Sequence, residues 1–138
     1  MQAERPRRFN RRDVEPALNA LSEQVIGAAI EVHRVLGPGL LESVYEEALC
    51  VELTLRGVPF IRQLQVDLAY KGHAVGKGRL DLLVDYQLIV ELKAVDALSD
   101  VHLAQVLSYL KTTGKQLGLL INFNVAVLKS GIRRVICS

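Results

Sequence analysis

The spacing of hydrophobic residues predicts two helices in the first half of the chain. Over "LSEQVIGAAIEVHRVLG" (21–37), apolar residues recur every three or four positions, with Ser22 as the predicted N-cap and Gly37 as the predicted stop. A second helix is expected from about residue 40 to residue 56. Its apolar stripe includes Leu41, Val44, Tyr45, Ala48, Val51 and Leu55.

Beyond residue 60, apolar residues alternate with polar ones, as they do along a strand with one buried face. "FIRQLQVDLAYKG" (60–72) predicts one strand, and "RLDLLVDYQLIVELK" (79–93) predicts two more that are joined by a short turn. The glycine-rich segment 70–78 lacks the spacing of a phosphate-binding loop, so a mobile hairpin is expected there.

Helical spacing returns over "LSDVHLAQVLSYLKTTGK" (98–115), with Ser99 as the predicted N-cap and Gly114 at the predicted C-terminal end. An apolar run at 117–123 predicts a buried strand, and residues 133–136 predict a last short one. The order of two helices, three strands, a helix and two strands predicts a mixed sheet flanked by helices, in the α/β (α+β) class.

The two strands within residues 79–93 carry charged residues where an interior strand pair should be apolar. If their turn centres on Tyr86, Asp81 lies opposite Glu91, with Cβ atoms ~5 Å apart. Lys93 then shares the face of Glu91, and Arg79 shares that of Asp81. The other face is wholly apolar, which predicts a central strand pair. That face consists of Leu80, Leu82, Val84, Leu88, Val90 and Leu92.

Two carboxylates ~5 Å apart repel each other by roughly 3 kcal/mol at an effective dielectric of 20. A divalent cation between them would offset this repulsion, and so would a structural ion-pair cluster with Lys93 and Arg79. The metal site is favoured, because buried charge clusters without a task are poor stabilisers. Such a site suits phosphodiester hydrolysis, in which a lysine can help orient or deprotonate the attacking water.

Composition places the chain among single-domain globular proteins. Its 138 residues are 50% hydrophobic, and no apolar run approaches the ~18 residues of a membrane span. No secretory signal precedes the domain, so a cytoplasmic protein is expected. Residues 1–16 are predicted to form a flexible basic arm before a single domain at 17–138. Five arginines against Glu4 give the first twelve residues a charge of +4, which either binds phosphates or merely solvates the chain.

An Asp followed on the next strand by Glu-x-Lys resembles the motif of the PD-(D/E)XK nuclease superfamily. Here it stands as "LD" (80–81) and "ELK" (91–93). More specifically, "GLLESVY" (39–45) resembles the GxxExxY signature of a family of small proteins placed in this superfamily. The likeness extends over residues ~20 to 137 and includes "EVHRVLGPGLLESVYEEAL", "GRLDLLVD", "ELKAV" and "GLLINF".

The resemblance implies a restriction-endonuclease-like αβββαβ core, with a central mixed sheet flanked by helices. It also implies that Asp81 and Glu91 bind Mg²⁺ or Mn²⁺ and that Lys93 is the catalytic lysine. Glu42 would be a further acid at the metal, although a carboxylate in the first turn of a helix also suits the helix dipole.

The resemblance also implies a role for the helix that follows the third strand. Gln105 would act with the catalytic residues, and Tyr109 would lie beside the substrate. Tyr45 and Arg79 are further expected substrate contacts, although Tyr45 could equally be a packing residue.

Together these features predict a Mg²⁺-dependent nuclease acting on nucleic acid, with DNA favoured over RNA. One alternative is a non-catalytic module of nuclease fold that binds nucleic acid or protein within a larger assembly. Another is a homodimeric resolvase selective for branched junctions. No membrane partner is expected.

Overall fold

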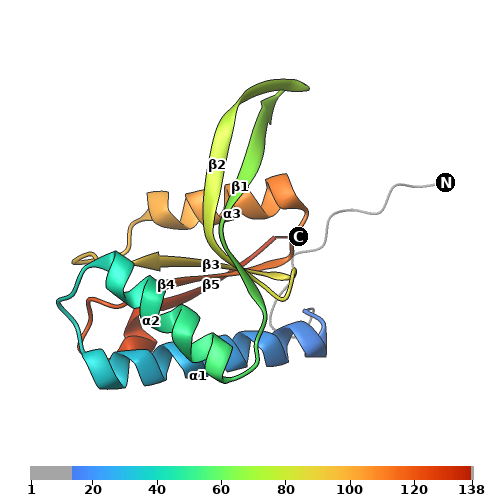
Figure 1. Ribbon diagram of the computed structural model, residues 1–138. Helices are drawn as coiled ribbons and strands as arrows, with labels where there is room; N and C mark the ends of the chain where they lie inside the picture. Colours follow the sequence, from blue (N-terminus) through green and yellow to red (C-terminus); the bar gives the residue numbers. More distant parts are fainter. Residues whose placement is uncertain (1–13, 138) are drawn as a thin grey trace.

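The computed structural model describes residues 14–137, in which a sheet lies between helices (Figure 1). The elements are α1 (Pro16–Leu36), α2 (Glu42–Leu55), β1 (Phe60–Tyr70), β2 (His73–Val84), β3 (Leu88–Lys93), α3 (Asp100–Thr113), β4 (Leu117–Asn122), the 3₁₀ turn η1 (Leu128–Gly131) and β5 (Ile132–Ile136). The five strands lie in the order β1-β2-β3-β4-β5. The β3–β4 pair is parallel and the other three neighbouring pairs are antiparallel, so the predicted mixed sheet and α/β class are confirmed.

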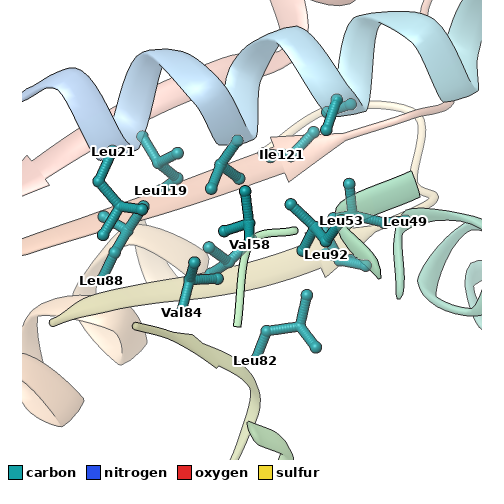
Figure 2. Close-up of a cluster of buried hydrophobic side chains, with 14 of the residues drawn as sticks. Leu21, Leu49, Leu53, Val58, Leu82, Val84, Leu88, Leu92, Leu119 and Ile121 are labelled. Carbon is teal, nitrogen blue, oxygen red and sulfur yellow. The ribbon is translucent and has the colours of Figure 1, made fainter. Parts of the chain in front are cut away.

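Helices α1 and α2 cover one face of the sheet, and α3 covers the other (Figure 1). Under α1 and α2, side chains such as Leu49 and Leu53 pack against Leu92 and Ile121 of the central strands (Figure 2). A smaller cluster under α3 is built around Val106. Strands β3 and β4 are buried on both faces, which explains why their sequences are apolar runs rather than alternating patterns.

The ends of the helices agree with the prediction in α3 but not in α1. The Ser99 hydroxyl accepts a hydrogen bond from the His102 N–H (3.3 Å), and Gly114 ends α3 at φ 71°, so both predicted caps are confirmed. The prediction of Ser22 as an N-cap was wrong, because α1 already begins at Pro16. Proline has a fixed φ that suits the first helical position and no N–H that would need a partner there.

Residues 1–13, most of the predicted basic arm, lie outside the described part of the chain. Val14 is buried in the core under α1 and α2, and α1 begins two residues later. Within residues 14–137, no helix has both the length and the apolar content needed to cross a bilayer.

Helix α2 buries only part of the apolar stripe predicted from its sequence: Tyr45 is buried and Ala48 packs against the core, whereas the other four members are exposed. Its buried residues are Tyr45, Glu46, Leu49, Cys50 and Leu53. Of the stripe, Leu41, Val44, Val51 and Leu55 are exposed, at 74%, 40%, 54% and 76% respectively. The stripe was wrong for these four residues because apolar residues occupy most of the circumference of α2, so spacing alone does not select one face.

Strands β1 and β2 are much longer than their neighbours and project from the sheet beside α3 as a two-stranded arm (Figure 1). We define the arm as residues 64–80. The chain reverses at Lys71 and Gly72, both at positive φ, within the segment predicted to be a hairpin. Strand β2 starts at His73, six residues before the start predicted for this strand, because its outer part pairs with β1 alone.

Candidate active site

The turn between β2 and β3 places the predicted acids opposite each other. Leu83 pairs with Ile89 and Val84 with Leu88, which is the register expected for a turn centred on Tyr86. The chain reverses through Asp85 and Tyr86 at positive φ. The predicted register is therefore confirmed, and its continuation brings Asp81 to Glu91.

At Asp81 and Glu91, side chains replace the backbone bonds of the strand pair. The Asp81 N–H donates to Glu91 Oε1 (3.1 Å), and the Leu92 N–H donates to Asp81 Oδ2 (2.8 Å). Each carboxylate is thus anchored by a backbone N–H of the opposite strand. Glu91 is only 4% exposed, so the pair lies at the floor of a depression rather than on the outer surface.

Burial makes Glu91 a weaker acid than an ordinary glutamate. Loss of hydration and, next in size, the negative charge of the neighbouring Asp81 carboxylate together raise the pKa of Glu91 to about 8, against a partial opposing effect of Lys93. At neutral pH and without a bound cation, Glu91 therefore holds a proton. A divalent cation would supply the positive charge that this proton otherwise provides.

The strand that carries Asp81 changes face at this point. Leu82 and Val84 pack under α1 and α2 as predicted, whereas Leu80 packs under α3. The prediction that Leu80 shares their face was wrong. Pairing between β2 and β3 ends at Leu82, and β2 then follows β1 into the arm, so strict alternation does not continue through Asp81.

Helix α2 delivers two further acids. Burial raises the pKa of Glu42, nearby Lys93 lowers it, and the negative charge of Asp81 raises it again, so Glu42 lies within the field of the same site. Glu46, one turn later, is buried and accepts hydrogen bonds from Arg62 Nε (2.8 Å) and Gln63 Nε2 (2.5 Å). Sequence reasoning missed Glu46, although its i, i+4 spacing from Glu42 was a usable signal.

Gln63 connects Glu46 of α2 with Asp81 of the sheet. Its amide nitrogen donates to Glu46 and, at 3.5 Å, faces Asp81 Oδ1. Gln63 has φ 55°, a strained conformation for a residue other than glycine. It lies between the Arg62–Leu82 and Leu64–Leu80 pairs, hence opposite Asp81. No pattern within β1 marks this residue, because its role depends on the register of the neighbouring strand.

These residues line a cleft of about 720 Å³ between α2, the arm, β3 and α3. Its walls contain acids and bases together with amide, hydroxyl and phenol groups, and Gly78 is the one residue without a side chain. The lining residues are Glu42, Ser43, Glu46, Gln63, Gln65, Lys77, Gly78, Arg79, Asp81, Glu91, Lys93, Gln105 and Tyr109. A cleft this polar suits a highly charged substrate better than an apolar ligand.

A comparison with known protein families identifies the family of the chain. A family model described as the PD-(D/E)XK nuclease superfamily matches residues 19–135. The chain belongs to the PD-(D/E)XK nuclease superfamily. No curated protein and no solved structure matches the chain significantly.

Seven of the eight residues predicted to form the site line the cleft. They are Asp81, Glu91, Lys93, Glu42, Gln105, Tyr109 and Arg79. Tyr45 does not. It is fully buried and stacks on Phe123, with ring centroids 4.6 Å apart. Its hydroxyl donates to the Gly37 carbonyl (2.6 Å) and accepts from the Leu40 N–H (3.1 Å). The position of Tyr45 therefore corresponds to the packing alternative and not to the expected substrate contact.

Tyr109 borders the cleft where α3 meets the arm. A Cβ atom placed on Gly78 would lie 2.6 Å from Tyr109 Cε1, closer than real carbon atoms approach. Gly78 therefore allows β2 to run directly against the tyrosine ring. This contact links the position of the arm to the helix that also carries Gln105.

The PD-(D/E)XK superfamily typically uses divalent metals, and the donor atoms here suit Mg²⁺ or Mn²⁺. Within residues 14–137, no three His, Cys, Asp or Glu side chains are grouped so that they alone could hold a metal ion. Mg²⁺ does not require such a group, since one or two carboxylates with waters and substrate phosphate oxygens are its usual ligands. The Asp81–Glu91 pair provides carboxylate oxygens of this kind, so the residues fit a cation bound jointly with substrate.

Proposed function

We propose that the protein is a Mg²⁺-dependent nuclease that hydrolyses phosphodiester bonds in nucleic acid, with DNA as the first substrate to test. The observation that carries the proposal is the anchoring of Asp81 and Glu91 by each other's strands, with Lys93 alongside, at the floor of a polar cleft. Such a constellation supplies the negative charge that binds a hard cation and a positive charge for the phosphoryl group.

Asp81 and Glu91 would hold Mg²⁺ or Mn²⁺, and Glu42 would be a further acid at the cation. When bound, the cation neutralises phosphoryl charge and lowers the pKa of a coordinated water. Lys93 orients the attacking water and offsets charge on the phosphoryl oxygens.

The remaining residues hold the acids and the substrate in place. Gln63 fixes Asp81 against Glu46, so it acts as a positioning residue. Lys77 and Arg79 are exposed on the arm side of the cleft and would contact phosphates that flank the scissile bond. Gln105 and Tyr109 would contact the substrate from α3.

The finer assignment to the GxxExxY group is part of the proposal, and each residue of that signature has a physical role here. Gly39 has φ 98°, a backbone conformation that favours glycine. Glu42 lines the cleft, and Tyr45 anchors the turn between Gly37 and Leu40 that precedes α2. The signature thus combines one residue of the proposed site with two residues that position its helix.

Cleavage of linear DNA and RNA with Mg²⁺ or Mn²⁺ tests the nuclease directly. Asp81→Asn, Glu91→Gln and Lys93→Met should each lower the rate at least ~100-fold, with folding checked by thermal melting. Glu31→Gln is the matched control, because Glu31 is an acid on α1 that pairs with Arg34 and does not line the cleft. Full activity in Lys93→Met, or equal loss in Glu31→Gln, would contradict the mechanism.

A non-catalytic nucleic-acid-binding module is the second candidate. It is supported by the exposed Lys77 and Arg79 beside the cleft, which would bind phosphates whether or not a bond is cleaved. Thermal melting during titration with Mn²⁺ separates the candidates. A rise in melting temperature that disappears in Asp81→Asn supports a functional metal site. No response up to millimolar Mn²⁺ supports the binding module.

A further inference from the structure

One side of α2, with the N-cap Leu41 that precedes it, carries four exposed apolar residues and one alanine that packs partly against the core. Leu41, Val44, Val51 and Leu55 are exposed, and Ala48 at the centre is half-buried. Within α2, spacings of four, three and four residues place Val44, Ala48, Val51 and Leu55 in one line along the helix, and Leu41 precedes this line at the N-cap. We call these five residues the outer stripe. A continuous apolar line of this kind marks an interaction surface, whereas single exposed apolar residues do not.

The outer stripe has the same sequence in both directions. Read from either end it is Leu, Val, Ala, Val, Leu, with Ala48 in the middle. If two α2 helices cross antiparallel at Ala48, Leu41 lies near the partner's Leu55, and Val44 lies near the partner's Val51. An interface between identical copies around a two-fold axis requires this self-complementarity, whereas an unrelated partner does not.

A groove beside the outer stripe can accommodate apolar side chains of a second copy. It has a volume of about 310 Å³ and lies between α1 and α2. Five of its lining residues are apolar and two are acidic. They are Val32, Val35, Leu36, Ala48, Val51, Glu31 and Glu52. The small side chain at Ala48 leaves this centre open, so a second helix can approach closely there.

The charges at the edge of the groove do not oppose self-association. Glu31 pairs with Arg34 (2.6 Å), and Glu52 pairs with Arg56 (2.8 Å). Each acid at the groove is thus neutralised by an arginine of its own helix. Two copies of this face therefore meet without net repulsion.

We propose that this face binds a second copy of the chain, with the two α2 helices antiparallel about an axis beside Ala48. Over the ~21 Å length of α2, the surfaces of α1 and α2, each ~10 Å wide, together offer a flat area of about 400 Å². A standard interface buries about 800 Å² per partner, so we expect a reversible dimer with a micromolar dissociation constant.

This dimer leaves the proposed active site accessible. Glu42 and Glu46, which line the cleft, lie about 140–180° around α2 from the middle of the outer stripe. Association and any catalysis therefore use opposite sides of the same helix. The dimer does not depend on the proposed nuclease function, and either can fail without the other.

Sedimentation equilibrium across nanomolar to submillimolar protein tests the proposal. The wild type should be dimeric at the upper end, and Val51→Glu or Leu55→Glu should raise the dissociation constant at least ~100-fold, because a carboxylate would be buried between apolar side chains. Val101→Glu is the matched control: Val101 is 75% exposed on α3, far from α2, and its variant should dimerise normally. Because the substituted side chains are exposed, folding should be unchanged in thermal melts.

Cross-linking tests the antiparallel register independently. In a Cys137→Ser background, with Cys50 buried, Ala48→Cys alone should form a disulfide dimer under mild oxidation. Val44→Cys should cross-link to Val51→Cys when the two variants are mixed, and much less to itself. A wild type that stays monomeric at submillimolar concentration, or a dimer unaffected by Val51→Glu, would overturn the proposal, and so would cross-linking at Val44→Cys alone.

Discussion

At the scale of single residues, the site depends on side chains that take over backbone roles. The Asp81 and Glu91 carboxylates each accept a hydrogen bond from a backbone N–H that, in an uninterrupted strand pair, would donate to a carbonyl. Their carboxylates are therefore held at fixed positions before any ligand binds. The same arrangement buries Glu91 beside a second acid, Asp81. The folded structure therefore raises the pKa of Glu91.

Glu91→Gln should change how stability depends on pH. Because the folded-state pKa of Glu91 is raised from 4.5 to about 8, its stabilising contribution is complete below pH 4.5 and is lost as the pH rises to 8. Gln stays neutral, so the variant should gain relative to wild type by up to roughly 1.4 kcal/mol per pH unit in this window. Urea unfolding in EDTA at pH 5, 6.5 and 8 measures the difference. A difference that is constant with pH would contradict the raised pKa.

Substitutions at Gln63 should separate strain from function. At φ 55°, Gln63→Gly should be more stable than Gln63→Ala by about 1 kcal/mol, since only glycine adopts this conformation freely. Both variants lose the bonds to Glu46 and Asp81, so both should cleave DNA equally slowly. Chemical unfolding and initial cleavage rates measure the two effects. If Gln63→Gly cleaved at the wild-type rate, the positioning role of the amide would be refuted.

At the scale of elements, the β2–β3 hairpin was predictable and the orientation of α2 was not. The short turn at Tyr86 and the apolar alternation around it allow one register, so the pairing of Asp81 with Glu91 followed from the sequence. Helix α2 is apolar around most of its surface, and its buried face was decided by packing against α1 and the sheet. In the sequence, Val44 and Val51 therefore look like core residues, and only the packing of the neighbouring elements shows that they are exposed.

Gly78→Ala tests how the arm is held against α3. The added Cβ would meet Tyr109 Cε1 at 2.6 Å, so either the Tyr109 ring or the arm must shift, and we expect a loss of about 1–3 kcal/mol. Tyr109→Ala should remove most of the penalty that Gly78→Ala adds. A double-mutant cycle in urea measures this coupling. Gly76→Ala is the control, because a Cβ at Gly76 would meet no atom within 4 Å.

At the scale of the whole molecule, the cleft collects residues from five separate elements. The acids on β2 and β3 were visible in the sequence because they interrupt apolar strands. Glu46 and Gln63 were not, because an ordinary polar residue on a helix or strand becomes part of a site only when the chain brings α2, β1 and β2 together. The fold class and the approach of Asp81 to Glu91 were therefore predictable, and the other residues that line the cleft around them were not.

Positive charge at the cleft should control affinity for DNA. Lys77→Met and Arg79→Met should each weaken binding and reduce the slope of log K against log salt by about 0.9, because each removes one phosphate contact. Lys129→Met, in η1 and absent from the cleft, should leave both unchanged. Fluorescence anisotropy with a labelled duplex in EDTA, at several salt concentrations, makes the measurement. Equal effects from all three lysine or arginine changes would assign the binding to net charge alone.

The outer end of the arm is the part of the fold least constrained by the rest. All residues from 69 to 77 are exposed, and their backbone bonds run between β1 and β2 alone. Adding or deleting matched residues on both strands would thus lengthen or shorten the arm without disturbing the acids at its base. A change in the length of the arm would therefore alter the size of substrate that reaches the cleft, while the residues of the proposed active site stay the same.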